Sequence, residues 1–291
     1  MSPTRLQLAR NDITGFFSSS NKKVYKRSDI DKILTRNRDY WKLTESTTGN
    51  KFIEYLVRLG KIREHVLAFP HKKEIRYTWG LVSDFQIIES LRLKSYFTHF
   101  TALHLHELTD QIPKTVYLNF EQPAKRGVSG QLAQDRIDLA FRNACRVSKT
   151  IAEFHGNRIC ILNGRFAGQK GVITVSDEFG ELIRISNLER TLIDCVVRPV
   201  YSGGVHSVLT AFKRAADDVS INKLTATLSS LNYIYPYHQA VGFYLERSGK
   251  YTESQISLID VLEKKFDFYL CHQMKQKEYS NRWKLYYPTG L

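Results

Sequence analysis

The sequence predicts an α+β protein with two domains, a small helical domain with a β-hairpin over residues 1–80 and a larger mixed domain over residues 81–291. A length of 291 residues favours two domains over one. The composition is that of a globular protein, with 42% hydrophobic residues, 25% charged residues and only 7 prolines. The apolar periodicity is helical up to a hairpin pattern near residue 80, and it mixes strands with helices afterwards.

The positive charge of the chain is concentrated near its N-terminus. The formal net charge is +14, from 43 Lys and Arg residues against 29 Asp and Glu residues. Residues 1–80 hold 17 basic and 8 acidic residues, a net charge of +9, whereas residues 81–291 hold 26 and 21, a net charge of +5. The localised excess indicates a module that binds nucleic acid. The remaining +5 fits either a second contact with a DNA backbone or plain solvation.

Two short helices are predicted in the first forty residues. Residues 13–17 form a first helical turn or short helix. Ser28 and Asp31 have the spacing of a capping box, with Ser28 as N-cap, so a second helix is expected to begin there. The apolar residues that follow lie on one helical face: Ile30, Ile33 and Leu34.

A third helix is predicted by apolar residues at spacings of four and three, followed by a glycine that ends it: Phe52, Leu56, Leu59 and Gly60. Two extended segments then follow, at residues 61–69 and 75–79, joined by a Pro-led loop at residues 70–74, and they predict a β-hairpin. Three helices and a hairpin in this order are typical of a winged helix-turn-helix.

In a winged helix-turn-helix the third helix enters the major groove of DNA and the hairpin approaches the backbone or the minor groove. Polar and basic side chains on these two elements are therefore the predicted DNA-binding residues: Thr47, Thr48, Asn50, Lys51, Tyr55, Arg58, Arg63, His71, Lys72, Lys73 and Arg76. The alternative is a protein-binding winged helix whose basic residues form only a solvated face, since the fold alone does not decide the partner. The charge of the module favours DNA.

For residues 81–291, the sequence predicts strands in the middle of the segment and helices later. Strands are predicted at residues 114–119, 158–162, 171–175, 181–185 and 283–287. Helices are predicted at residues 188–197, 204–217, 220–231, 237–248 and 254–271.

The sequence offers no catalytic, cofactor-binding or metal-binding set. His104 and His106 would point to nearly opposite sides of a helix, so they do not pair on a metal. Glu263 belongs to a Glu-x-Lys pattern, but it lies in a predicted helix rather than on the strand that such nuclease chemistry uses. No apolar run suits a signal peptide or a membrane span, which predicts a cytoplasmic protein without membrane partners. Widely spaced cysteines fit reduced thiols in that compartment: Cys145, Cys160, Cys195 and Cys271.

Several segments of the larger domain resemble one family. The first is Phe97–Pro113, with Thr-Ala-Leu, His-Glu-Leu-Thr and Ile-Pro in order. Ile185–Asp194 contains Glu-Arg-Thr-Leu and is followed by Tyr201–Gly204 with a Gly-Gly pair. Tyr235–Leu245 and Trp283–Pro288 complete the set. In order and spacing these segments resemble the AbiEi-type antitoxins, the transcriptional-regulator half of type IV toxin–antitoxin systems. Glu107 stands where many members of that family carry glycine.

The resemblance implies an N-terminal domain that binds double-stranded DNA at inverted repeats in its own promoter, and a C-terminal antitoxin domain. The partner would be a toxin of the nucleotidyltransferase class, counteracted with or without a stable complex. Such a protein is an autorepressor in a phage-defence operon of the abortive-infection type, and neither role requires catalysis or a cofactor. Two alternatives remain: an orphan winged-helix regulator that senses a ligand through its second domain, and a DNA-processing nuclease.

Overall fold

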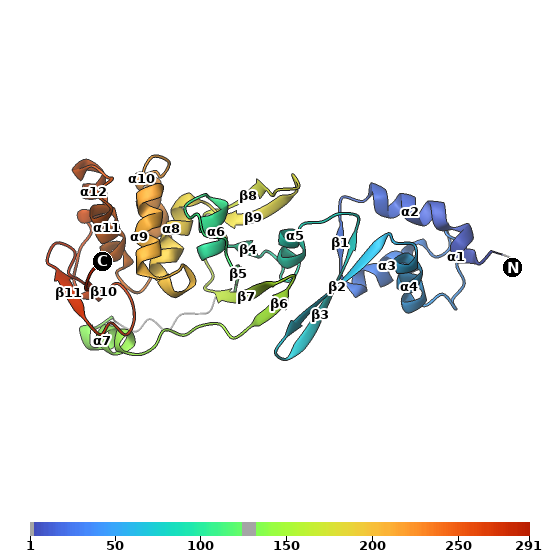
Figure 1. Cartoon of the computed structure of the whole chain (residues 1–291), viewed down its shortest axis with the longest axis horizontal. Coiled ribbons are helices and arrows are strands. Elements are labelled where there is room, and N and C mark those ends of the chain that lie inside the picture. The colour runs from blue at the N-terminus through green and yellow to red at the C-terminus, as the bar shows by residue number, and fades with distance from the viewer. Residues whose placement is uncertain (1–2, 124–131) are drawn as a thin grey trace. The chain divides into compact units, whose positions relative to one another are not determined.

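The computed structural model describes residues 3–123 and 132–291 (Figure 1). The chain forms two compact units. The first unit comprises Met1–Leu93 with two later segments, Ala152–Gly156 and Val175–Ile183. The second unit comprises the remaining segments, Lys94–Ile151, Asn157–Thr174 and Arg184–Leu291. Helices and a mixed sheet occur together, so the predicted α+β class is confirmed.

In the first unit, helices come before a β-hairpin, as the sequence predicts, and further elements follow the hairpin. Its helices are α1 (Arg5–Leu8), α2 (Arg10–Ser19), α3 (Arg27–Asn37), α4 (Gly49–Arg58) and α5 (Asp84–Glu89). Its strands are β1 (Val24–Tyr25), β2 (Ile62–Phe69), β3 (Lys72–Trp79) and β6 (Ile151–Phe154), in the order β1-β3-β2-β6. All of the pairings in this part of the sheet are antiparallel.

Aromatic side chains fill the core of the first unit. Phe17 stacks on Trp79 with ring centroids 4.9 Å apart, and Trp41 stacks on Phe52 at 5.7 Å. Of the apolar residues predicted on one face of α3 and α4, Ile30, Leu34, Phe52 and Leu56 are buried in the same cluster, whereas Ile33 and Leu59 are half-buried. Gly60 follows the end of α4, which is the predicted third helix, and has a φ of 63°, in the left-handed region that favours glycine.

The cap of α3 differs from the predicted one. The helix begins at Arg27, and the backbone N–H of Lys26 donates to Oδ2 of Asp29 at 2.8 Å. Asp31 instead accepts from Nε of Arg27 at 3.1 Å, and Ser28 lies exposed inside the first turn. The predicted Ser28–Asp31 capping box is therefore wrong, because Asp29 lies three residues after a different N-cap and is also held by Lys22 at 2.8 Å.

The β-hairpin is longer than its sequence pattern suggests. Pairing between β2 and β3 runs without interruption from Ile62↔Trp79 to Phe69↔Lys72, which leaves Pro70 and His71 as the turn. The predicted loop over residues 70–74 is wrong, because residues 72–74 continue the strand. Lys72 and Lys73 therefore extend from the end of a regular ladder.

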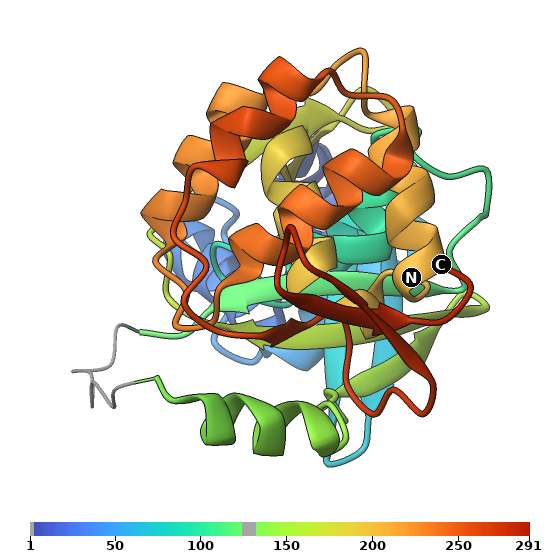
Figure 2. The same ribbon diagram turned by 90° about the vertical axis from the view of Figure 1, so that its left-hand side faces the viewer.

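The second unit combines a mixed sheet with a group of helices (Figures 1 and 2). Strand β5 (Thr115–Glu121) pairs in parallel with β7 (Asn157–Gly164) and antiparallel with β4 (Tyr96–Phe97). Strand β4 pairs in parallel with β9 (Leu182–Ser186), which follows β8 (Val172–Ser176). The predicted strands at residues 114–119, 158–162, 171–175 and 181–185 correspond to β5, β7, β8 and β9.

The helices of the second unit pack into one large apolar core. They are α6 (His99–Leu105), α7 (Gln134–Arg142), α8 (Leu188–Val197), η1 (Pro199–Tyr201), α9 (Val205–Arg214), α10 (Ile221–Leu231), α11 (Tyr237–Ser248) and α12 (Glu253–Asp260). A small sheet of β10 (Phe268–Tyr269), β12 (Leu285–Pro288) and β11 (Lys277–Ser280) closes the chain, in that strand order. Figure 2 shows α7, in green, beside this small red sheet and away from the orange helices.

Two predicted elements near the C-terminus have different bounds. The predicted helix over residues 254–271 ends at Asp260, because Phe268 and Tyr269 pair with Leu285 and Tyr286 in the small sheet. Glu263 consequently lies outside any helix or strand. The last predicted strand, residues 283–287, begins at Leu285. Among the described residues, no helix has the length and apolar character to cross a membrane.

Candidate nucleic-acid interface

Helix α4 presents one apolar and one polar face. Phe52, Ile53 and Leu56 are buried in the core of the first unit. The N-cap is Thr48, whose hydroxyl accepts from the backbone N–H of Lys51 at 3.4 Å. Free backbone N–H groups at such a helix start favour phosphate binding, as does the helix dipole.

The exposed side of α4 carries polar side chains at a spacing of four residues. Asn50, Glu54 and Arg58 are exposed along this side, and Lys51 lies next to Asn50. Asn50, Lys51 and Arg58 were predicted from the sequence, whereas Glu54 was missed because an acidic residue argues against DNA contact. Glu54 could have been found by its helical spacing of four residues from Asn50. Its carboxylate can accept a hydrogen bond from the amino group of cytosine.

Thr47 does not belong to this exposed surface. Its side chain is 7% exposed, and its carbonyl oxygen accepts from the guanidinium of Arg38 at 3.1 Å. Arg38 also donates to the carbonyl oxygen of Thr44. The prediction that Thr47 contacts DNA is wrong, because the residue serves to fix the turn that precedes α4.

Tyr55 faces the core more than the solvent. It packs against the apolar cluster of the first unit, and its buried hydroxyl has no hydrogen-bond partner among the described residues. Burial raises the pKa of this hydroxyl, and the charge of Arg10 opposes that effect. The predicted contact of Tyr55 with a DNA groove is therefore wrong, since the only polar atom of its side chain is turned away from the solvent.

The hairpin carries exposed basic residues at its end and on β2. Arg63, His71, Lys72 and Lys73 are all exposed, and their contact with DNA stays a prediction. Lys72 forms an ion pair with Glu74 at 2.8 Å, whereas Lys73 forms none with the residues that the structure describes. The ammonium group of Lys73 is consequently more available to a phosphate than that of Lys72.

Arg76 is buried rather than available to DNA. Its side chain is 4% exposed, and the guanidinium donates to Oε2 of Glu74 at 3.0 Å and to Oγ of Ser90 at 3.0 Å. Burial alone would raise the pKa of Glu74, but hydrogen bonds from Lys72 and Arg92 lower it to about 2. The predicted DNA contact of Arg76 is wrong, because the guanidinium joins β3 to the end of α5.

Further exposed cations in the first unit were not among the predicted residues. Lys32 and Arg36 lie on α3, and Lys61 directly precedes β2. None of the three side chains forms an ion pair within the described part of the chain. They are additional candidates for contacts with phosphates, which attract any accessible cation irrespective of sequence.

The Glu-Arg-Thr-Leu segment of the second unit supplies a buried ion pair. Arg190 and Asp194 lie one turn apart on α8, are 5% and 6% exposed, and have Nε and Oδ1 2.7 Å apart. The guanidinium of Arg190 also donates to the carbonyl oxygen of Lys170 at 2.9 Å and to the Tyr96 hydroxyl at 3.3 Å. Burial lowers the pKa of Arg190, but Asp194 outweighs this effect and raises it.

The ion pair connects the segments that carry the family resemblance. Thr98, which precedes α6, donates to Oδ2 of Asp194 at 2.9 Å. Asn119 on β5 donates to the Tyr96 hydroxyl at 2.7 Å. These side chains are buried, so they hold the second unit together and are not exposed to a partner.

The glycines of the resembling segments have the same structural role. A Cβ on Gly203 would lie 3.0 Å from the ring of Phe100, and the residue has a φ of 78°. A Cβ on Gly242 of α11 would lie 2.0 Å from the ring of Trp283, so this glycine lets the indole reach the helix backbone.

The histidines near α6 do not form a metal site. His99 is 8% exposed and its buried Nδ1 has no hydrogen-bond partner among the described residues, and burial lowers its pKa to about 4. His106 donates from Nε2 to the carbonyl oxygen of Ser186 at 2.7 Å. No cluster of three or more potential metal ligands occurs within residues 3–123 and 132–291.

Glu107 follows α6 with a φ of 59°, in the left-handed region that favours glycine. We expect Glu107→Gly to raise the free energy of unfolding by up to about 1 kcal/mol, because the strain is relieved at some cost in chain entropy. Chemical denaturation measures the difference. Glu107→Ala removes the same charge and keeps the strain, so equal stabilisation by alanine and glycine would refute the backbone explanation.

Comparisons with known proteins show similarity in fold only. No protein-family model matches the sequence, and no curated protein matches it. Among solved structures, the crystal structure of the RV2827C protein from Mycobacterium tuberculosis is similar, with a TM-score of 0.58 and 12% sequence identity. The match covers 98% of this chain and 92% of that chain. The chain therefore shares the fold of that protein over almost its whole length.

Proposed function

We propose that the protein is a DNA-binding transcriptional autorepressor whose first unit contains a winged helix-turn-helix. The order of α2, α3 and α4 followed by the β2–β3 hairpin supports this proposal. In the proposed complex, α4 lies in the major groove with Asn50 and Lys51 near the bases. The hairpin then lies along the backbone with Lys73 near phosphates.

The observation that carries the proposal is the polarity of α4. The helix has a buried apolar face that fixes it on the core, and an exposed face on which the Asn50 amide and two cations are accessible. Amide and guanidinium groups form the paired hydrogen bonds that distinguish bases in the major groove. A face used only for solvation would not need a net charge of +9 in the surrounding 80 residues.

The second part of the proposal is that the protein is the antitoxin of a type IV toxin–antitoxin operon and counteracts a nucleotidyltransferase toxin in the cytoplasm. The segments that resemble AbiEi-type antitoxins support it, as does the left-handed backbone at Glu107, where that family commonly carries glycine. Part of these segments, including Arg190 and Asp194, is buried in the core of the second unit. Neither repression of the operon nor neutralisation of the toxin requires catalysis by this chain.

The test combines binding to DNA with neutralisation of the toxin. Fluorescence anisotropy with a labelled fragment from upstream of the gene should give tight binding, and a scrambled fragment weaker binding. Co-expression with the toxin encoded in the same operon should restore growth, also with a variant that no longer binds DNA. Equal affinity for both fragments would refute the autorepressor, and failure to restore growth would refute the antitoxin.

The hairpin lysines should contribute to affinity without sequence preference. We expect Lys72→Ala with Lys73→Ala to weaken binding to every DNA sequence and to reduce the slope of log K against log salt by up to about two. Lys73→Ala alone should account for most of the change, because Lys72 is paired with Glu74. Titrations at several salt concentrations measure the slope. An unchanged slope in the double variant would mean that the hairpin does not approach the backbone.

A further inference from the structure

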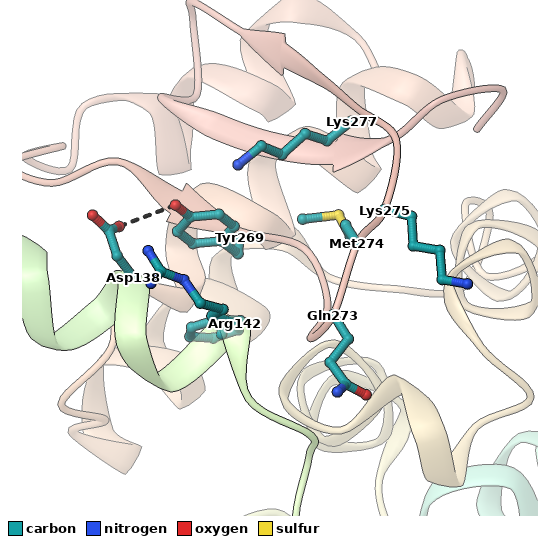
Figure 3. Close-up of a pocket in the computed structure, with 8 residues that line it drawn as sticks. Asp138, Arg142, Tyr269, Gln273, Met274, Lys275 and Lys277 are labelled. Carbon is teal, nitrogen blue, oxygen red and sulfur yellow. Dashed lines mark hydrogen bonds between the residues drawn. The ribbon is translucent and has the colours of Figure 1, made fainter.

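A cavity in the second unit has the chemistry of a binding site for an anion. It has a volume of about 580 Å³ and lies between α7 and the chain from β10 to β11. Arg142 and Asp138 border it from the α7 side, and Tyr269, Met274 and Lys277 border it from the other (Figure 3). A cavity of this size suits a small molecule much larger than a single inorganic ion.

The cavity walls are connected by hydrogen bonds, so the site is formed before any ligand arrives. The side chain of Gln134 on α7 donates to the carbonyl oxygen of Asp267 at 3.0 Å and accepts from its N–H at 2.9 Å. The Tyr269 hydroxyl donates to Asp138 at 3.0 Å. The N–H of Gln273 donates to the carbonyl oxygen of Phe141 at 2.8 Å. A preformed site binds its ligand without the cost of ordering its walls.

A stack of aromatic rings supports one of the cations. Tyr269 stacks between Phe141, at 5.6 Å, and Tyr286, at 5.0 Å. The ammonium of Lys277 lies 5.1 Å from the Tyr269 ring centroid and 4.3 Å from that of Tyr286. The rings attract the cation but do not neutralise it, so its charge remains available to an anion.

The positive charge of the cavity exceeds its negative charge. Arg142 and Lys277 form no ion pair with any residue that the structure describes, and Lys275 adds a third cation at the rim. The one carboxylate on the lining, Asp138, already accepts from the Tyr269 hydroxyl and, at 2.8 Å, from Gln134. A phosphate between Arg142 and Lys277 would complete the charge balance, since a guanidinium and an ammonium are the usual phosphate-binding groups of proteins.

The backbone of the lining is strained at one residue. Gln273 has a φ of 54°, in the left-handed region that is unfavourable for residues other than glycine. Such strain persists where the surrounding contacts impose it, and it is frequent at ligand-binding sites. Met274 and Lys277, which follow Gln273 in the chain, both face the cavity (Figure 3).

We propose that this cavity, which we call the α7 pocket, binds a nucleoside phosphate. The phosphate would lie between Arg142 and Lys277, and the nucleoside would lie against the side chain of Met274. The volume and the apolar part of the lining favour a ligand with a ring system over inorganic phosphate. All of these residues belong to the second unit, so the site is independent of the proposed DNA-binding surface.

The test uses the full-length protein and isothermal titration calorimetry with AMP, ADP and ATP. Tripolyphosphate and ribose 5-phosphate serve as separate probes for the phosphate and the sugar phosphate. We expect at least one nucleotide to bind, and Arg142→Gln to weaken it by at least about tenfold. Lys275→Gln should weaken it less. Because neither side chain forms an ion pair in the described structure, the melting temperature of both variants should match that of the parent. Lys223→Gln on α10 is the matched control and should bind normally.

Several outcomes would overturn the proposal. The first is the absence of binding of all three nucleotides at millimolar concentration. A second is equal affinity for tripolyphosphate or ribose 5-phosphate, which would show that the base is not recognised. A third is binding that Arg142→Gln leaves intact, which would place the ligand elsewhere. If a single-stranded oligonucleotide binds in an Arg142-dependent way and mononucleotides do not, the pocket belongs to a nucleic-acid strand and the nucleotide proposal fails.

Discussion

Replacing Arg190 by methionine is expected to destabilise the second unit by about 3–5 kcal/mol, because it leaves the carboxylate of Asp194 buried without its partner. The guanidinium also holds the carbonyl oxygen of Lys170 and the Tyr96 hydroxyl, so more than one buried group loses a hydrogen bond. Urea denaturation followed by circular dichroism and by tryptophan fluorescence measures the loss. Trp283 reports on the second unit, and Trp41 and Trp79 report on the first.

Two further variants separate the buried ion pair from ordinary surface charge. Arg190→Met combined with Asp194→Leu should recover much of the stability, because no unpaired charge remains inside. Arg214→Met removes the partner of Asp110 in an exposed pair and should have a much smaller effect. If Arg190→Met unfolded at the same urea concentration as Arg214→Met, the ion pair would not be a stabilising centre of the second unit.

Loss of the exposed polar residues of α4 should abolish recognition of the operator. We expect Asn50→Ala, Lys51→Ala and Arg58→Ala together to reduce operator affinity by at least about 100-fold, since each base-reading side chain contributes about 1–3 kcal/mol. The side chains are exposed, so the fold should be retained. Anisotropy titrations with operator and scrambled DNA measure both the affinity and the ratio between the two sequences.

The matched control for this triple variant lies in the other unit. Asn222, Lys223 and Lys213 are exposed on α10 and α9, and their replacement by alanine removes one amide and two cations, as in the α4 variant. This control should keep the preference for the operator. If both triple variants lost affinity equally and neither lost the preference for the operator, binding would depend on net charge and not on α4.

Local patterns in the sequence were sufficient to predict the main elements of the first unit. Apolar residues at helical spacing give α4 because Phe52 and Leu56 are both buried in the core, and Gly60 ends the helix by its own conformational freedom. The cap of α3 was misplaced because several polar residues near its start can act as caps. Asp29 has the additional bond from Lys22, which no local rule anticipates.

The errors in the predicted site come from contacts between distant residues. Arg76 appears on an alternating strand like an exposed cation, but its position opposite Ser90 on the chain after α5 is a tertiary feature. The hydroxyl of Tyr55 is buried for the same reason. The α7 pocket has no local signal, since Arg142 and Lys277 are brought together only by the packing of α7 against the β10 segment. Burial of polar groups is decided by such packing and not by residue type.

Trp283 packs against Gly242 in the core of the second unit, far along the chain from the core of the first unit. The two cores are therefore completed at different times during synthesis. The apolar core of the first unit draws on residues between Ala9 and Trp79, all of which leave the ribosome early. The core of the second unit includes Trp283 and Leu285, so it stays incomplete until these two residues have been translated. On a nascent chain, the core that holds the helix proposed to read DNA is thus completed before the core of the part proposed to neutralise the toxin.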